Sequence, residues 1–218
     1  TGIAAGLQAL GLEPGANVAL MLPTSFEYFF CFFGVLLAGA VPVPLYPPMR
    51  PAQFEDHLRR HCHILNNCQA RLLVTVAEAR PLARFLKAQV ASMRRIVTVE
   101  GLRAAAATCT PPPLTAEDTA FLQYTSGSTG IPKGVILSHA NLLANIRAMG
   151  RAINAGPDDV FVSWLPLYHD MGLIGAWLGS LYHGCQFVVM SPLAFLMHPE
   201  RWLWTIHRHR GTLSASPN

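Results

Sequence analysis

Short apolar runs of strand length alternate along this chain with longer segments whose apolar residues recur at helical spacing. The apolar runs predict strands at 17–22, 40–45, 71–75, 95–99, 119–124, 134–137, 159–164, 186–190 and 212–215. The helical segments are at 2–10, 25–38, 53–67, 81–91, 140–151, 172–182 and 199–209. This alternation is typical of layered parallel sheets wrapped by helices, so the sequence predicts an α/β fold.

One segment, 102–118, interrupts the alternation. It runs through four consecutive alanines into Pro111-Pro112-Pro113, a composition typical of an irregular surface connection. We therefore expect a first α/β lobe at 1–101 and a second at 119–218. The chain lacks an initiator Met and the last predicted strand has only begun at 212–215, so we also expect a fragment of a longer protein.

Composition and charge exclude several classes of protein. Of the 218 residues, 51% are hydrophobic, which is enough to bury a large core. The net charge is +4, and the basic residues form no stripe with aromatic side chains, which argues against a nucleic-acid partner. The longest apolar stretch, 28–41, is shorter than the roughly 20 residues of a membrane span and predicts a buried helix. Peripheral contact with a membrane stays open.

The cysteines and histidines indicate a compartment but no metal. Five cysteines without a C-x-x-C pair favour reduced thiols and a cytoplasmic location. A cluster of imidazole and thiol side chains could suggest zinc, but its spacing matches no zinc finger, and we predict no metal site. Its members are His57, His61, Cys62, His63 and Cys68.

A Gly-rich loop at 125–134 carries the strongest chemical signal. Its sequence, Thr-Ser-Gly-Ser-Thr-Gly-Ile-Pro-Lys-Gly, can turn backbone amides and hydroxyls toward one anion, and Lys133 adds a mobile positive charge. The loop is not a Walker P-loop, because Gly134 and a strand pattern follow Lys133. The composition alone also fits a flexible surface hairpin rich in turn residues.

The stretch from Tyr124 to Gly134 is similar to the signature of the acyl- and aryl-adenylate-forming superfamily, which includes acyl-CoA synthetases, luciferases and peptide-synthetase adenylation domains. The resemblance implies the N-terminal portion of the adenylate-forming fold, incomplete here. It implies that the loop binds the β and γ phosphates of ATP, that Mg²⁺ shields their charge, and that Lys133 assists the reaction. The residues it assigns to ATP binding are Thr125, Ser126, Gly127, Ser128, Thr129, Gly130 and Lys133.

A second motif, 164–173, follows a predicted strand, where doubly wound sheets place their ligands. It contains Tyr168-His169-Asp170-Met171-Gly172, and in the superfamily the corresponding histidine lies between the acyl pocket and the adenylate. The resemblance assigns His169 to gating or to the substrate carboxylate, as a catalytic residue that abstracts no proton. Asp170 would orient the imidazole or bind elsewhere in the substrate pocket, which would also include Met171.

Within the superfamily, 43–48, 168–175 and 191–196 resemble fatty acyl-AMP ligases. Ser216-Pro217-Asn218 is similar to their pocket-side loop, with Ser216 at a position that is usually Gly. Six large aromatic residues supply apolar surface for a lipid pocket or for an ordinary core: Trp164, Trp177, Phe187, Phe195, Trp202 and Trp204.

The resemblance implies that ATP activates a fatty acid as an acyl-adenylate, which then passes to an acyl carrier protein. The alternatives are an acyl-CoA ligase, with CoA as acceptor, and a non-catalytic nucleotide- or lipid-binding module. The superfamily's later motifs, a magnesium-binding Glu, a ribose-binding Asp and a catalytic Lys, would lie after Asn218. We therefore expect the 218-residue segment alone to be inactive.

Overall fold

The computed structural model describes residues 1–46, 54–104, 108–125 and 131–217. These residues form two compact units, 1–139 and 140–218, which are described separately. Both units combine parallel strands with helices, which confirms the predicted α/β class. Within the described residues, no helix is both long enough and apolar enough to cross a membrane.

A four-stranded parallel sheet in the order β2-β1-β3-β4 organises unit 1. Its strands are β1 (Asn17–Met21), β2 (Val41–Leu45), β3 (Leu72–Thr75) and β4 (Arg95–Thr98). Every residue of β2 and β3 is buried, as are four of the five residues of β1. Burial of consecutive residues means that both faces of the sheet are covered, which is why these strands read as unbroken apolar runs in the sequence.

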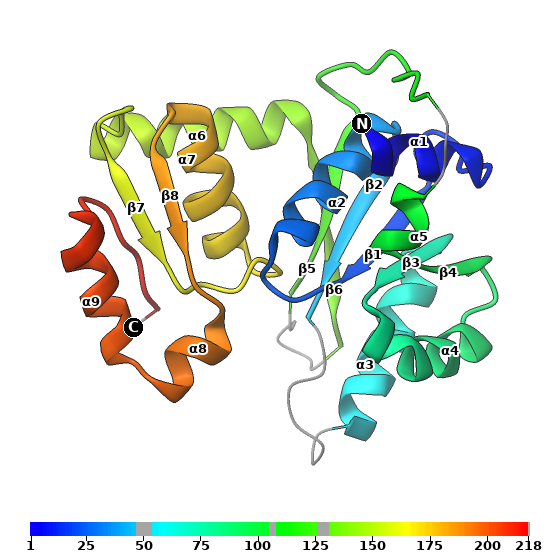
Figure 1. The fold of residues 1–218 in the computed structure, drawn as a ribbon. Helices are drawn as coiled ribbons and strands as arrows, with labels where there is room; N and C mark the ends of the chain where they lie inside the picture. The colour runs from blue at the N-terminus through cyan, green and yellow to red at the C-terminus, as the bar shows by residue number, and fades with distance from the viewer. Residues whose placement is uncertain (47–53, 105–107, 126–130, 218) are drawn as a thin grey trace. The chain divides into compact units, whose positions relative to one another are not determined.

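Helices cover both faces of this sheet (Figure 1). They are α1 (Gly2–Ala9), α2 (Phe26–Leu37), α3 (Phe54–Asn67), α4 (Arg80–Gln89) and α5 (Val99–Arg103), with a 3₁₀ turn at Ala77–Ala79. Leu65 of α3 and Leu86 of α4 pack in one cluster with Ala19, Met21 and Val43 of the sheet. The helix predicted from the stretch 28–41 is α2, which ends before Gly39 adopts a positive φ of 76°.

A hairpin of two antiparallel strands completes unit 1. Its strands are β5 (Thr119–Thr125) and β6 (Lys133–Ser138). Phe121 of β5 is fully buried, and its ring lies 5.8 Å from the ring of Phe32 in α2. This packing explains why the division into compact units comes after His139. The lobes expected at 1–101 and 119–218 stay a prediction about domain organisation.

The segment expected to be an irregular connection is partly helical. The helix α5 occupies its first two residues, because Thr98 accepts a cap hydrogen bond from the Gly101 amide at 3.4 Å and Leu102 is buried. Residues 108–115 form neither helix nor strand, as predicted.

Unit 2 contains the parallel strands β7 (Val160–Ser163) and β8 (Gln186–Val189). Its helical elements are most of α6 (His139–Ile153), a π-helix η3 (Met171–Leu178), α7 (Gly179–His183), α8 (Pro192–Met197) and α9 (Glu200–His209). Two expectations need correction, and one helix was missed. The single helix predicted at 172–182 is a π-helix followed by an α-helix, the strand predicted at 212–215 is one bridge from Leu213 to Phe161, and α8 was not predicted.

Candidate functional site

The Gly-rich loop connects the two strands of the hairpin in unit 1. Thr125 ends β5, Lys133 begins β6, and the two residues are direct partners in the antiparallel register. Both are exposed. A strand follows Lys133, which confirms that this is a hairpin loop and not the loop-to-helix arrangement of a Walker motif. The predicted ATP-binding residues Ser126, Gly127, Ser128, Thr129 and Gly130 lie outside the described residues.

The side chain of Tyr124 contacts both α3 and the second strand of this hairpin. Its hydroxyl donates a hydrogen bond of 2.5 Å to Oδ1 of Asn67, the last residue of α3. Its ring lies against Gly134, its cross-strand partner: a Cβ atom at position 134 would be only 2.9 Å from Tyr124 Cζ. Burial raises the pKa of the Tyr124 hydroxyl, so this group stays protonated and can donate.

Because of the contact with Tyr124, a methyl group at position 134 should measurably destabilise the fold. Gly134→Ala should lower the free energy of unfolding of the full-length protein by about 1–3 kcal/mol, the usual cost of overpacking, because the ring must move. Denaturant unfolding measures this. Gly101→Ala is the matched control, since a Cβ atom there would meet nothing closer than the Thr98 hydroxyl at 3.5 Å. Equal stability of the two variants would contradict the steric account.

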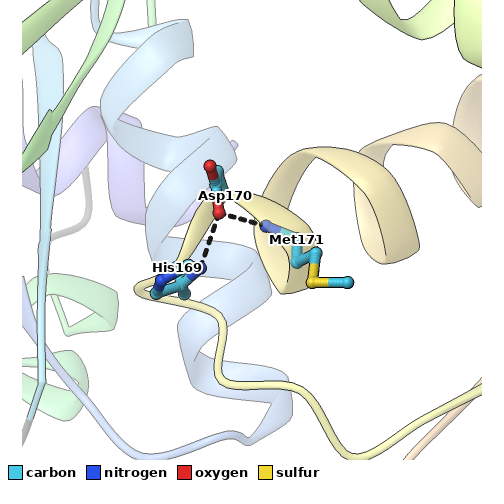
Figure 2. A network of polar contacts seen from close by, with 3 residues as sticks. All are labelled: His169, Asp170 and Met171. Carbon is cyan, nitrogen blue, oxygen red and sulfur yellow. Dashed lines mark hydrogen bonds and ion pairs between the residues drawn. The ribbon is translucent and has the colours of Figure 1, made fainter. Parts of the chain in front are cut away.

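The second predicted site lies at the start of the π-helix η3 in unit 2 (Figure 2). His169 Nδ1 lies 2.5 Å from Asp170 Oδ1, and the same oxygen accepts a hydrogen bond from the Met171 amide at 2.7 Å. The structure thus brings together three of the predicted pocket residues. Because an ionised carboxylate only accepts hydrogen bonds, this contact requires a proton on Nδ1.

This polar pair is accessible to a ligand. The side chains of His169 and Asp170 are 66% and 63% exposed, and Met171 is 38% exposed. Irregular helical hydrogen bonding of the π type occurs often at functional sites. The turn before η3 is tight, because the His169 amide donates to the Pro166 carbonyl at 3.2 Å.

The remaining predicted pocket residues are only partly described. Ser216 and Pro217 are exposed and lie in neither helix nor strand, and Asn218 is outside the described residues. In the described part of unit 2, no hydrogen bond or ion pair joins Ser216 to His169. Their place in a substrate pocket stays a prediction.

Three of the six large aromatic residues form one cluster. Trp164, directly after β7, stacks on Phe195 of α8 with ring centroids 3.9 Å apart, and Trp202 of α9 meets Phe195 edge-on at 5.9 Å. Trp202 Nε1 donates to Ser214 Oγ, which donates to the Val162 carbonyl. The other three differ: Trp177 is buried, Phe187 packs beside Phe161, and Trp204 is 69% exposed. Sequence reasoning could not separate these two groups.

The histidines that suggested zinc are engaged within unit 1. His57 and His61 stack with ring centroids 3.9 Å apart. The two nitrogens of His61 lie 2.7 Å and 3.1 Å from the carbonyl oxygens of His57 and Tyr46. Across the described ranges, no three His, Cys, Asp or Glu side chains gather as a metal site would require. Both rings are therefore part of the core.

Burial makes this histidine pair a source of pH dependence. It lowers the pKa of His57 to about 3 and that of His61 to about 4, below the value of about 6.5 in an unfolded chain. Between pH 6.5 and pH 4 the unfolded state therefore binds more protons, so the free energy of unfolding should fall as the pH falls through this range. Urea unfolding at a series of pH values measures the slope. His57→Gln should flatten the slope, while the exposed control His63→Gln should not.

Comparison with known proteins places these two motifs in context. A profile described as "AMP-binding enzyme" matches residues 1–218. The long-chain-fatty-acid–AMP ligase FadD32 of Mycolicibacterium smegmatis is 38% identical in an alignment of 224 positions that covers 99% of this chain and 35% of that protein. The medium-chain-fatty-acid–[acyl-carrier-protein] ligase JamA of Moorena producens is 36% identical over 95% of this chain and 36% of its own. The chain thus spans about a third of the length of these curated relatives.

Solved structures show the same relationship. A structure from work on fatty acyl-adenylate ligases of E. coli and L. pneumophila superposes with a TM-score of 0.88 at 35% identity, over 99% of this chain and 39% of that one. The fatty acyl-adenylate ligase of L. pneumophila in complex with acyl adenylate and pyrophosphate gives a TM-score of 0.86 at 36% identity, over 99% and 37% of the two chains.

Proposed function

Since the chain belongs to the AMP-binding enzyme family, we propose that it is part of an enzyme that activates a fatty acid with ATP. A carboxylate oxygen of the acid attacks the α-phosphorus of ATP, a new carbon–oxygen–phosphorus linkage forms, and the bond to the β-phosphate breaks. The products are acyl-adenylate and pyrophosphate. The observation that carries this proposal is the likeness, over 99% of the chain, to a ligase bound to those two products.

The hairpin of unit 1 supports an ATP-binding role. A displacement at phosphorus depends mainly on positioning and on neutralisation of charge. The exposed Lys133 ammonium, beside Thr125 at the base of a Gly-rich loop, can supply a positive charge to the pyrophosphate that leaves. We assign the β and γ phosphates of ATP to this loop.

Mg²⁺ would shield the charge of the polyphosphate in this reaction. The described residues gather no set of three or more carboxylate, imidazole or thiol ligands. We therefore assign no residue of this chain to the ion and derive no step from it.

His169 is the residue we assign to the substrate carboxylate. A fatty acid is already ionised at neutral pH, so the imidazole need not remove a proton. Asp170 accepts a hydrogen bond from Nδ1, so a contact with the carboxylate or with the adenylate formed from it uses the imidazolium form, in which Nε2 also carries a proton and donates it. The exposed apolar side chain of Met171 would lie along the start of the acyl chain. Ser216, Pro217 and Asn218 remain candidates for the pocket-side loop.

We propose an acyl carrier protein as the acceptor of the acyl group. Two relatives carry that acceptor in their names: JamA, and TtuA of Teredinibacter turnerae, which is 50% identical over 102 residues. All five cysteines are free thiols, which suits a reducing compartment, and we place the reaction in the cytoplasm.

Isotope exchange between pyrophosphate and ATP tests the proposal in the full-length protein. We expect exchange that depends on a medium- or long-chain fatty acid, followed by transfer of the acyl group to holo acyl carrier protein in preference to CoA. No exchange with any fatty acid, together with retained ATP binding, would favour a nucleotide-binding module instead. Transfer to CoA at the higher rate would identify an acyl-CoA ligase.

A further inference from the structure

The hydrogen bond between Tyr124 and Asn67 joins two parts of unit 1 that are 57 residues apart. Asn67 ends α3, a helix held in the core by Ile64 and Leu65, which are 2% and 0% exposed. Tyr124 is the residue directly before Thr125. The bond therefore connects the base of the Gly-rich loop to a well-packed helix.

The ring of Tyr124 extends this connection to the second strand of the hairpin. It fills the space that the missing side chain of Gly134 leaves: a Cβ atom there would lie 2.9 Å from Cζ and 3.1 Å from the hydroxyl oxygen. Gly134 follows Lys133 directly. One side chain thus contacts α3 on one side and β6 on the other, next to the lysine.

The chemistry of the donor and the acceptor keeps this hydrogen bond formed at physiological pH. Burial, together with the nearby Cys68 thiol, raises the pKa of the Tyr124 hydroxyl, so it remains a donor at physiological pH. The acceptor is an amide oxygen, which does not titrate. A second hydrogen bond, of 2.6 Å from Asn17 Nδ2 to the Cys68 carbonyl, fixes the end of α3 at the next residue.

We propose that Tyr124 is a positioning residue for Lys133: by bonding Asn67 and packing on Gly134, it holds the first residue of β6 in the orientation that meets the ATP polyphosphate. The inference rests on the proposed function, because it concerns the same lysine. It also predicts that removal of the Tyr124 hydroxyl, with the aromatic ring retained, weakens ATP binding.

Kinetics of the full-length protein test this inference. Tyr124→Phe and Asn67→Leu should each raise the KM for ATP by about three- to tenfold, the factor that corresponds to one hydrogen bond, while the KM for the fatty acid stays unchanged. Asn67→Asp keeps an acceptor oxygen at the same place and should stay near the wild-type KM. The double variant Tyr124→Phe/Asn67→Leu should raise the KM for ATP no further than either single variant does, because the two substitutions remove the same hydrogen bond.

Asn17→Ala supplies the matched control. It removes a hydrogen bond from the same end of α3 but does not touch the hairpin, so it should lower the unfolding midpoint without changing the KM for ATP. An unchanged KM in Tyr124→Phe, or an equal rise in Asn17→Ala, would overturn the inference and leave Tyr124 a packing residue.

Failure of the proposed function has a separate signature, which is absence of fatty-acid-dependent exchange in the wild type. In that case the dissociation constant of a non-hydrolysable ATP analogue still tests the inference. A larger dissociation constant for Tyr124→Phe than for wild type supports it, and equal constants contradict it.

Discussion

Lys133→Ala should reduce the rate of acyl-adenylate formation by the full-length enzyme by about 100- to 1,000-fold, the loss typical when a group that stabilises developing charge is removed. The lysine is exposed at the first position of β6 and takes part in no ion pair with another described residue. Its charge therefore contributes little to the fold and is available to a phosphate. Pyrophosphate exchange measures the rate.

Lys87 offers a control of the same residue type. It is the only other lysine in the chain and is exposed in the last turn of α4. Lys87→Ala should retain the wild-type exchange rate, and both variants should unfold at the wild-type midpoint. Comparable activity of Lys133→Ala and Lys87→Ala would show that Lys133 does not meet the phosphates.

Gly172→Ala should disrupt the second motif through the backbone. A Cβ atom at this position would lie 2.3 Å from the Pro166 carbonyl oxygen and 2.9 Å from its carbon. Backbone atoms cannot rotate away as a side chain can, so the turn that carries His169 must shift. We expect a loss of about 3 kcal/mol or more in the free energy of unfolding, at the upper end of overpacking costs, and exchange activity reduced by at least about tenfold.

The same π-helix contains the control for this change. A Cβ atom at Gly175 would meet no atom within 4 Å, so Gly175→Ala should leave both stability and activity near wild type. Circular dichroism melts and the exchange assay distinguish the two variants. If Gly172→Ala is as stable and active as Gly175→Ala, the motif does not depend on this close approach.

Strands and long helices could be predicted from the sequence because their burial repeats over many residues. In β2 and β3 every residue is buried, and these strands appear as apolar runs flanked by turn residues. The helix α8 has only six residues, too few for a periodic signal, although Ser191 and Pro192 are the start signals of such a helix. The π-helix was missed because most of its residues are apolar, so no polar face reveals its period.

The candidate sites depend on contacts that the chain order only partly reveals. His169 and Asp170 are neighbours in sequence, so their pairing could be anticipated, and the structure confirms it. The bond from Tyr124 to Asn67 spans 57 residues and leaves no pattern in a single sequence. The role of Gly134 also leaves no pattern in the sequence: the structure shows that the space beside Tyr124 requires this glycine.

The path of one carboxylate oxygen tests the central claim most directly. The full-length enzyme would be supplied with ATP, holo acyl carrier protein and a fatty acid labelled with ¹⁸O in both carboxyl oxygens. Mass spectrometry would then measure the masses of the products. If the carboxylate attacks the α-phosphorus, AMP must carry one ¹⁸O atom after the acyl group has passed to the thiol. AMP without label, or label in orthophosphate accompanied by ADP, would contradict an acyl-adenylate intermediate.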